Sequence, residues 1–288
     1  MTTTQTPAPA TATAEPAAAD TPAAPAAPAG KDYSVPVLPG TGDTDYARYM
    51  RTDTLLSLQR RPEEVIHRDE LLFQVVHQST ELWLKLACQE LTDSTRLIGE
   101  GAFDTAVRLL ERARLGVRLA TDQLEMMRRL SPWDFQTIRT VLGHGSGFES
   151  PGWAAARRAT ALLGEAFDRV VDERGIDLAE VYRTQPDTPV HRLAEALIGW
   201  DEGISLWRVE HCKMALRLLG EDVLGTKGIP IGVLTKLIGH QFFPRLWLVR
   251  TELTRTGPMG DAAPATTPAP TPAAPSPAAP LPEENART

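Results

Sequence analysis

Two histidines occupy unusual positions in this sequence, because each is surrounded by large apolar residues. His77 lies within LLFQVVHQSTELWLKL (71–86), and His211 lies within WRVEHCKMALRLLG (207–220). An imidazole among Phe, Val, Leu and Trp needs partners for its ring nitrogens. The two segments have helical periodicity, so the rings come from different helices. Such a pair suits a large planar ligand between helices. Haem is the first candidate, since one imidazole can bind iron while the other lines the oxygen side.

The neighbours of each histidine agree with this interpretation. Phe73, His77 and Thr80 share a helix face by their i, i+4, i+7 spacing, so His77 projects beside an aromatic ring. His211 follows Trp207 by one helical turn and precedes an aliphatic run, and a dry apolar wall of this kind is typical of a haem proximal ligand. Either residue alone could instead be a structural histidine bonded to a backbone carbonyl, and for His77 that is the commoner situation.

Further polar residues could recognise an amino acid. Arg139 follows Phe135 by one helical turn, just before the glycine-rich loop LGHGSGF (142–148). Its guanidinium could clamp a carboxylate, or it could be a surface arginine with a buried stem. Tyr46 and Tyr49 share a helix face and could line a pocket, or could be core aromatics. The GHGSG run lacks the preceding strand of a serine-hydrolase elbow, so we exclude that chemistry.

The elements that must position these residues are helices. Strand patterns are almost absent, whereas apolar residues recur at helical spacing along the middle of the chain. The predicted helices cover residues 43–60, 68–98, 104–130 with Asp104 as N-cap, 132–142, 153–174, 189–219, and a last one from 233 that is interrupted or bent around Pro244. The predicted fold class is therefore all-α, an antiparallel bundle with long helices.

Composition sets the domain limits. Residues 1–40 and 257–288 are dominated by Ala, Pro and Thr, and such segments lack the apolar groups that offset ordering entropy, so both are predicted to be disordered tails. Residues 41–256 are predicted to form one domain. The N-terminus lacks the basic start and apolar run of a secretory signal, and no segment is apolar enough to span a bilayer.

The net charge and the cysteine content limit the classes of partner and metal site that the protein could have. The formal net charge of −7 disfavours nucleic acid and anionic membranes. Cys88 and Cys212 lie among apolar helical neighbours and are too few and too distant for a cysteine zinc site. We expect them to be reduced thiols of a cytoplasmic protein.

Several motifs in collinear order over residues 46–250 resemble those of the tryptophan 2,3-dioxygenase family. They are Tyr46-x-x-Tyr49 with Asp53-Thr54-Leu55-Leu56; Phe73-Gln74-Val75-Val76-His77-Gln78 with Glu81-Leu82-Trp83; Ser131-Pro132, Asp134-Phe135, Arg139 and Leu142-Gly143; Trp207-Arg208-x-x-His211; and Phe243-Pro244-x-Leu246-Trp247.

The resemblance implies an all-α homotetramer that binds haem b, with His211 as the axial ligand of the iron and dioxygen as co-substrate on the His77 side. It further implies that His77 contacts the indole nitrogen and that Phe73 lines the pocket beside the indole ring. Arg139 would pair with the carboxylate, and Thr226 would hold the ammonium. Tyr46 and Tyr49 would enter a neighbouring subunit's pocket. The expected reaction inserts oxygen at the indole C2–C3 bond of L-tryptophan and gives N-formylkynurenine, a step of tryptophan catabolism.

One loop departs from the family pattern. There it usually reads Gly-Thr-Gly-Gly, followed by two small hydroxyl residues and glycine, whereas here Lys227, Ile229 and Pro230 interrupt it. The iron and indole contacts match the pattern, and the amino-acid end differs. We therefore keep two alternatives: a related monooxygenase that acts on a methylated tryptophan or indole in secondary metabolism, and a non-catalytic haem or indole sensor.

Overall fold

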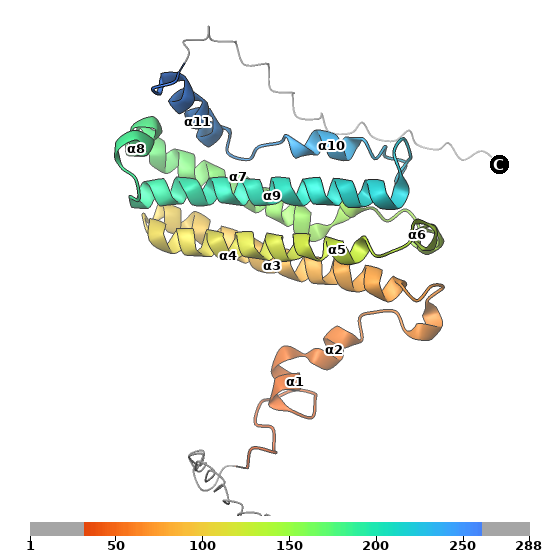
Figure 1. Ribbon diagram of the computed structural model, residues 1–288. Helices are drawn as coiled ribbons and strands as arrows, with labels where there is room; N and C mark the ends of the chain where they lie inside the picture. Colours follow the sequence, from red (N-terminus) through yellow and green to blue (C-terminus); the bar gives the residue numbers. More distant parts are fainter. Residues whose placement is uncertain (1–31, 261–288) are drawn as a thin grey trace, which may run out of the picture. The chain divides into compact units, whose positions relative to one another are not determined.

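The structure, a computed structural model, describes residues 32–260 (Figure 1). Most of both predicted tails lies outside this range. The described residues form helices and no named strand, apart from an isolated antiparallel bridge between Leu224 and Pro230. The predicted all-α class is confirmed. The described residues divide into two compact units, with the boundary between Leu58 and Gln59.

The first unit contains two short helices where one was predicted. α1 (Asp45–Met50) begins at Thr44, whose side chain accepts a hydrogen bond from the Ala47 backbone N–H at 3.1 Å. Arg51 then adopts a left-handed conformation with φ of 53° and separates α1 from α2 (Thr52–Leu56). A left-handed residue ends the helical hydrogen-bond pattern, so the prediction of one continuous helix over 43–60 was wrong.

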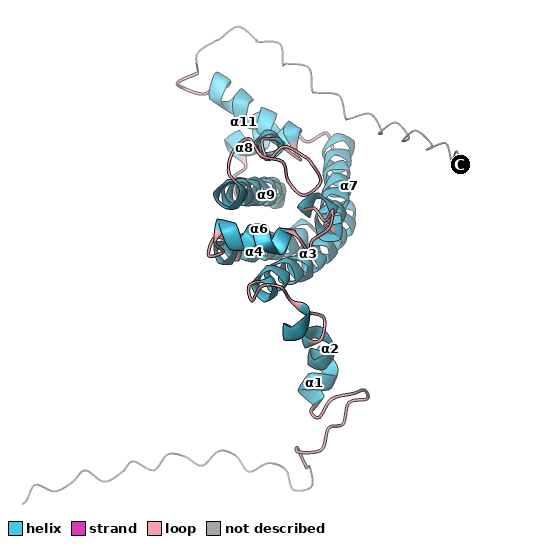
Figure 2. Ribbon diagram, turned by 90° about the vertical axis from the view of Figure 1, so that its right-hand side faces the viewer, coloured by secondary structure: helices cyan, strands magenta, loops and turns pink. Residues whose placement is uncertain are grey.

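The second unit is built on long helices, and shorter elements connect them. The elements are η1 (Pro62–Glu64), α3 (Glu70–Gly99), α4 (Phe103–Asp122), α5 (Leu124–Met127), α6 (Pro132–Arg139), η2 (Gly147–Glu149), α7 (Pro151–Glu173), α8 (Leu178–Thr184), α9 (Pro189–Leu219), α10 (Val233–Ile238) and α11 (Pro244–Thr256). α3 packs against both α4 and α7, and α4 also packs against α9 (Figures 1 and 2). Long apolar stripes on these helices bury one another, which is the predicted bundle arrangement.

One predicted helix needs correction, the predicted interruption around Pro244 is confirmed, and one helix was not predicted. The segment predicted as one helix over 104–130 begins at Phe103, after Ala102 as N-cap, and splits into α4 and α5 at Gln123. The segment from Val233 contains two helices, because Pro244 occupies the first turn of α11, where its missing N–H costs nothing. α8 was not predicted, although the Asp177 side chain caps it by accepting the Glu180 N–H at 3.1 Å.

The core has two apolar clusters. The larger one joins α3, α4, α7 and α9, and includes Leu91, Leu110, Leu163 and Leu197. The smaller one includes Val76, Met127, Ile138 and Met214, near the ends of the long helices. Within the described residues, none of the helices is both long and apolar enough to cross a bilayer.

Side chains hold α7 and α9 in position across the bundle. Trp200 of α9 is fully buried, and its indole N–H donates to the Thr160 hydroxyl of α7 at 3.0 Å. On the other side of α9, the buried carboxylate of Asp201 accepts the Phe242 N–H and the Trp247 indole N–H, each at 2.9 Å. These bonds set the spacing between α7 and α9 and attach the C-terminal helix.

Substituting Thr160→Val should destabilise the protein by about 1–3 kcal/mol, because the buried Trp200 N–H loses its acceptor while the side-chain volume is kept. Thr160→Ser keeps the hydroxyl and is the matched control. Urea denaturation at constant m-value measures the difference. Equal midpoints for the two variants would contradict the assigned role of this bond.

Candidate active site

A cavity of about 480 Å³ lies in the second unit. Its size is in the usual range for binding sites of small molecules and cofactors. Side chains of α3, α6, α7 and α9 line it, together with the loops 142–150 and 220–232. Most of the lining is apolar. The predicted site residues on its wall are Phe73, His77, His211 and Thr226. The two histidines, 134 positions apart in sequence, therefore face the same space.

His77 is held in one orientation. Its Nδ1 lies 2.7 Å from the backbone carbonyl oxygen of Phe73, one turn earlier in α3. Since a carbonyl only accepts, Nδ1 carries the proton and Nε2 of the neutral ring is left as an acceptor. The Phe73 ring centroid is 4.1 Å from that of His77, and Phe135 adds a second aromatic ring 6.0 Å from Phe73. Burial lowers the pKa of His77, so the ring is neutral at neutral pH.

His211 has the features of a metal ligand. Its ring stacks on Trp207, with centroids 4.8 Å apart and planes 9° apart. Among the residues that the structure describes, no hydrogen-bond partner of the His211 ring is found. Burial lowers its pKa to about 4, and the charge of His77 acts in the same direction. A neutral imidazole without a protein partner, facing an apolar cavity, has a lone pair available for a metal ion.

Glu81 connects α3, the helix that carries His77, to the start of α7. Its two carboxylate oxygens accept hydrogen bonds from the Ser150 hydroxyl and from the Gly152 N–H, the latter at 2.8 Å. A Cβ at Gly152 would lie 2.5 Å from the Glu81 carboxylate and 2.9 Å from Leu84, so only glycine fits this close approach. The next residue, Trp153, packs on Trp207 with centroids 4.0 Å apart.

Arg139, predicted to pair with the substrate carboxylate, bonds groups of the protein in this structure. One guanidinium nitrogen donates to the Gln136 side chain at 2.9 Å, and another donates to the Leu224 carbonyl oxygen at 3.2 Å. It is not among the residues that line the cavity, whereas Thr226, two positions after Leu224, is. In this structure Arg139 therefore supports the loop that carries Thr226.

Tyr46 and Tyr49 belong to the first unit, described separately above. Their side chains are 67% and 77% exposed. Contacts within the first unit therefore leave both rings largely exposed. Their role at a neighbouring subunit's pocket stays a prediction.

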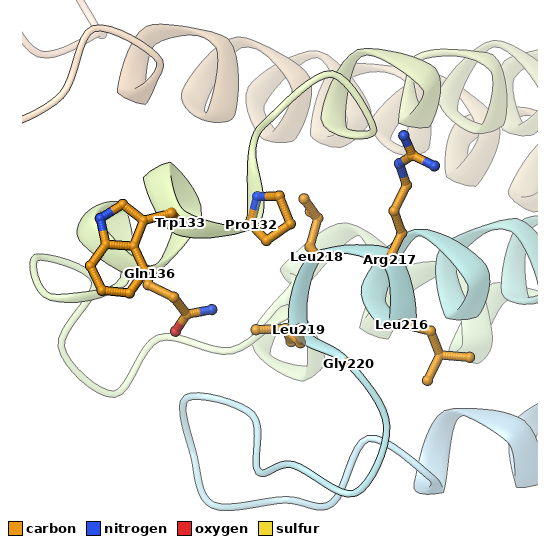
Figure 3. A pocket seen from close by; sticks show the side chains of 8 residues that line it. All are labelled: Pro132, Trp133, Gln136, Leu216, Arg217, Leu218, Leu219 and Gly220. Atoms are coloured by element: carbon orange, nitrogen blue, oxygen red, sulfur yellow. The ribbon is translucent and has the colours of Figure 1, made fainter.

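A second hollow lies where the end of α9 meets α6 (Figure 3). Its volume is about 450 Å³, and Trp133 on its edge is 79% exposed. Arg217 is the one ionisable residue in its lining. A groove with a single charged group lacks the convergent polar side chains of a catalytic site.

Sequence reasoning missed three charged residues of the cavity wall, which are Glu81, Arg157 and Arg208. Glu81 follows His77 by four positions, so helical periodicity could have placed it on the same face. Arg208 donates to the His240 carbonyl oxygen at 2.8 Å, and burial lowers its pKa. Arg157 comes from α7, and no local pattern relates it to Arg208 on α9.

The donor set of this cavity fits haem. A ring nitrogen of His211 is free to bind iron, and apolar walls suit a porphyrin. The buried indole N–H of Trp207 also lacks a partner within the described chain, as expected where a bound group completes the wall. Arg157 and Arg208 supply two cations on the same cavity for the acidic groups of a cofactor.

The depressed pKa of His211 predicts how ligand-free protein responds to acid. The folded-state value of about 4 is below the ordinary 6.5, so the unfolded chain binds the proton first. This contribution to stability is complete above pH 6.5 and is lost as the pH falls towards 4. His211→Phe should reduce the acid-induced loss by on the order of 2 kcal/mol. Urea titrations across this range measure it, and parallel curves for the two proteins would refute it.

Comparison with known proteins agrees with this geometry. A sequence model described as tryptophan 2,3-dioxygenase matches residues 36–174. A tryptophan 2,3-dioxygenase of Myxococcus xanthus is 28% identical over 271 residues, covering 75% of this chain and 92% of the relative. The corresponding proteins of Rhodococcus jostii and Caulobacter vibrioides are 29% and 28% identical, covering 73% of this chain and 92% and 99% of their own lengths. The matched segment contains α3 and α7, so the similarity to tryptophan 2,3-dioxygenases includes the helices that carry His77 and Trp153.

Proposed function

We propose that this protein is a haem-dependent dioxygenase that inserts both atoms of O2 at the indole C2–C3 bond of L-tryptophan and releases N-formylkynurenine. One observation supports this most directly. Two neutral imidazoles from α3 and α9 face one apolar cavity, and one of them has no protein partner within the described residues. The names of the relatives give the substrate and the reaction class.

In this proposal His211 is the axial ligand of haem b, and Arg157 and Arg208 neutralise the two propionates. When bound, haem supplies the iron centre at which dioxygen is activated. Trp207 supports the ligand, because its ring stacks on the imidazole and limits its rotation. The apolar walls exclude water from the reacting atoms.

His77 positions the indole in the same scheme. Its Nδ1 proton is donated to the Phe73 carbonyl, so Nε2 accepts a hydrogen bond from the indole N–H. Phe73 and Phe135 form an aromatic wall beside it, suited to a planar ring. His77 therefore orients the C2–C3 bond, and its neutral state at physiological pH makes this hydrogen bond available.

Arg139 and Thr226 are the proposed contacts of the amino-acid end. Arg139 reaches the carboxylate by exchanging the Leu224 carbonyl oxygen for a charged acceptor, which forms a stronger bond. Thr226, on the same loop, lines the cavity, and its hydroxyl oxygen accepts a hydrogen bond from the ammonium. We also propose a cytoplasmic homotetramer, in which the exposed Tyr46 and Tyr49 enter a neighbouring subunit's pocket.

The product identifies the reaction. Haem-loaded, reduced protein mixed with L-tryptophan under 18O2 should give a product that has gained two labelled oxygen atoms and has the absorbance of a ring-opened indole. Mass spectrometry and the ultraviolet spectrum record this. A gain of one atom with an intact indole spectrum would instead indicate a monooxygenase, and no oxygen uptake would exclude both enzymes.

His211→Ala should weaken haem binding by at least about tenfold, because the cavity loses its only proposed iron ligand. Haem titration followed by the Soret band measures the affinity. His144→Ala is the control, since His144 is exposed and does not line the cavity. A normal Soret band and affinity in His211→Ala would overturn the ligand assignment.

A further inference from the structure

An ion pair joins two loops that line the cavity. Lys227 Nζ, from the loop 220–232, contacts Glu149 Oε1, at the end of the loop 142–150. The other carboxylate oxygen of Glu149 accepts the Ser146 N–H at 2.9 Å. Across the described residues, no other hydrogen bond or ion pair links these two loops. Lys227 itself lines the cavity, as do Phe148 and Ser150 on either side of Glu149.

This ion pair is both charged and easily exchanged. Lys227 lowers the pKa of Glu149, and the Ser146 N–H lowers it further, so the carboxylate is ionised at neutral pH. The side chains are 38% and 50% exposed, and exposed ion pairs of this kind add little to stability. The Ser146 bond also fixes Glu149 independently of Lys227. The carboxylate can therefore keep its position when another cation replaces the lysine.

Other polar groups near the amino-acid end are already engaged. The Arg139 guanidinium bonds Gln136 and Leu224, and each oxygen of the Glu81 carboxylate accepts a hydrogen bond from the start of α7. Ile229 and Pro230, on the same loop as Lys227, have no hydrogen-bonding side chain, and both line the cavity. An ammonium group that enters beside Lys227 would meet Glu149, a carboxylate whose cationic partner is exposed and can be exchanged.

We propose that the Lys227–Glu149 pair determines specificity for the charged end of the substrate. The ammonium of the amino acid takes the place of Lys227 at Glu149, and the released Lys227 pairs with the carboxylate, beside Arg139. One ion pair is exchanged for two, and no charge is left unpaired. This inference rests on the proposed function, because it assumes that the indole ring occupies the His77 end of the same cavity.

Four ligands distinguish the contribution of the ammonium to binding from that of the carboxylate. They are L-tryptophan, tryptamine without the carboxylate, indole-3-propionate without the ammonium, and 3-methylindole with neither. Calorimetry on the haem-loaded protein without oxygen gives each dissociation constant. Glu149→Gln should weaken the binding of L-tryptophan and tryptamine about five- to tenfold, should tighten that of indole-3-propionate because Lys227 is freed, and should leave that of 3-methylindole unchanged. Lys227→Met should weaken the binding of L-tryptophan and indole-3-propionate by a similar factor. It should tighten the binding of tryptamine, because Glu149 is freed.

A matched control is available on α3, where Arg96 and Glu100 form an exposed ion pair that does not line the cavity. Arg96→Met and Glu100→Gln should change none of the four constants. Equal shifts for all four ligands, or no shift, in the Lys227 and Glu149 variants would overturn the inference. If wild-type protein binds neither L-tryptophan nor 3-methylindole, the proposed function fails instead.

Discussion

The site depends on keeping two imidazoles neutral in an apolar cavity inside a helical bundle. Burial is the main cause of the lowered pKa at both His77 and His211. A charged ring at either position would lose its hydration, and a proton on His211 would occupy the lone pair that a metal ion needs. The burial that lowers these pKa values also supplies the dry, aromatic walls required to bind a planar cofactor and an indole.

The bundle creates this cavity by leaving α7 and α9 partly separated. α3 packs on α7 and α4 packs on α9, while the contacts between α7 and α9 include the Trp153–Trp207 ring pair and the Trp200–Thr160 hydrogen bond. Trp200 and Thr160, joined by a hydrogen bond, and Trp153 and Trp207, whose rings are in contact, all line the cavity. Because tight helix packing would eliminate the space, these large side chains serve as spacers as well as core residues.

The two ends of the cavity have different physical character. The His77 end is bounded by Phe73 and Phe135, so in the proposed function shape and one hydrogen bond would select the ring. The loop end carries Lys227, Thr226 and the adjacent Glu149, where, under the proposal above, charge would select the substituent. Discrimination by a few exposed charges can change through single substitutions without disturbing the buried imidazoles.

Local and periodic features could be predicted from the sequence. Helical periodicity identified the long helices, the all-α class and the shared face of Phe73 and His77, because these depend on residues within a few turns. The left-handed Arg51 and the break at Gln123 were missed, since a one-residue change in backbone conformation leaves little trace in an apolar pattern. The α8 helix was also missed, because it is short, although Asp177 caps it. Tertiary packing decided that His77 and His211 share one cavity and that Arg139 bonds Leu224. It also decided that Lys227 meets Glu149. These contacts join residues about 80 or more positions apart, and only the arrangement of α3, α6, α7, α9 and their loops brings such residues together.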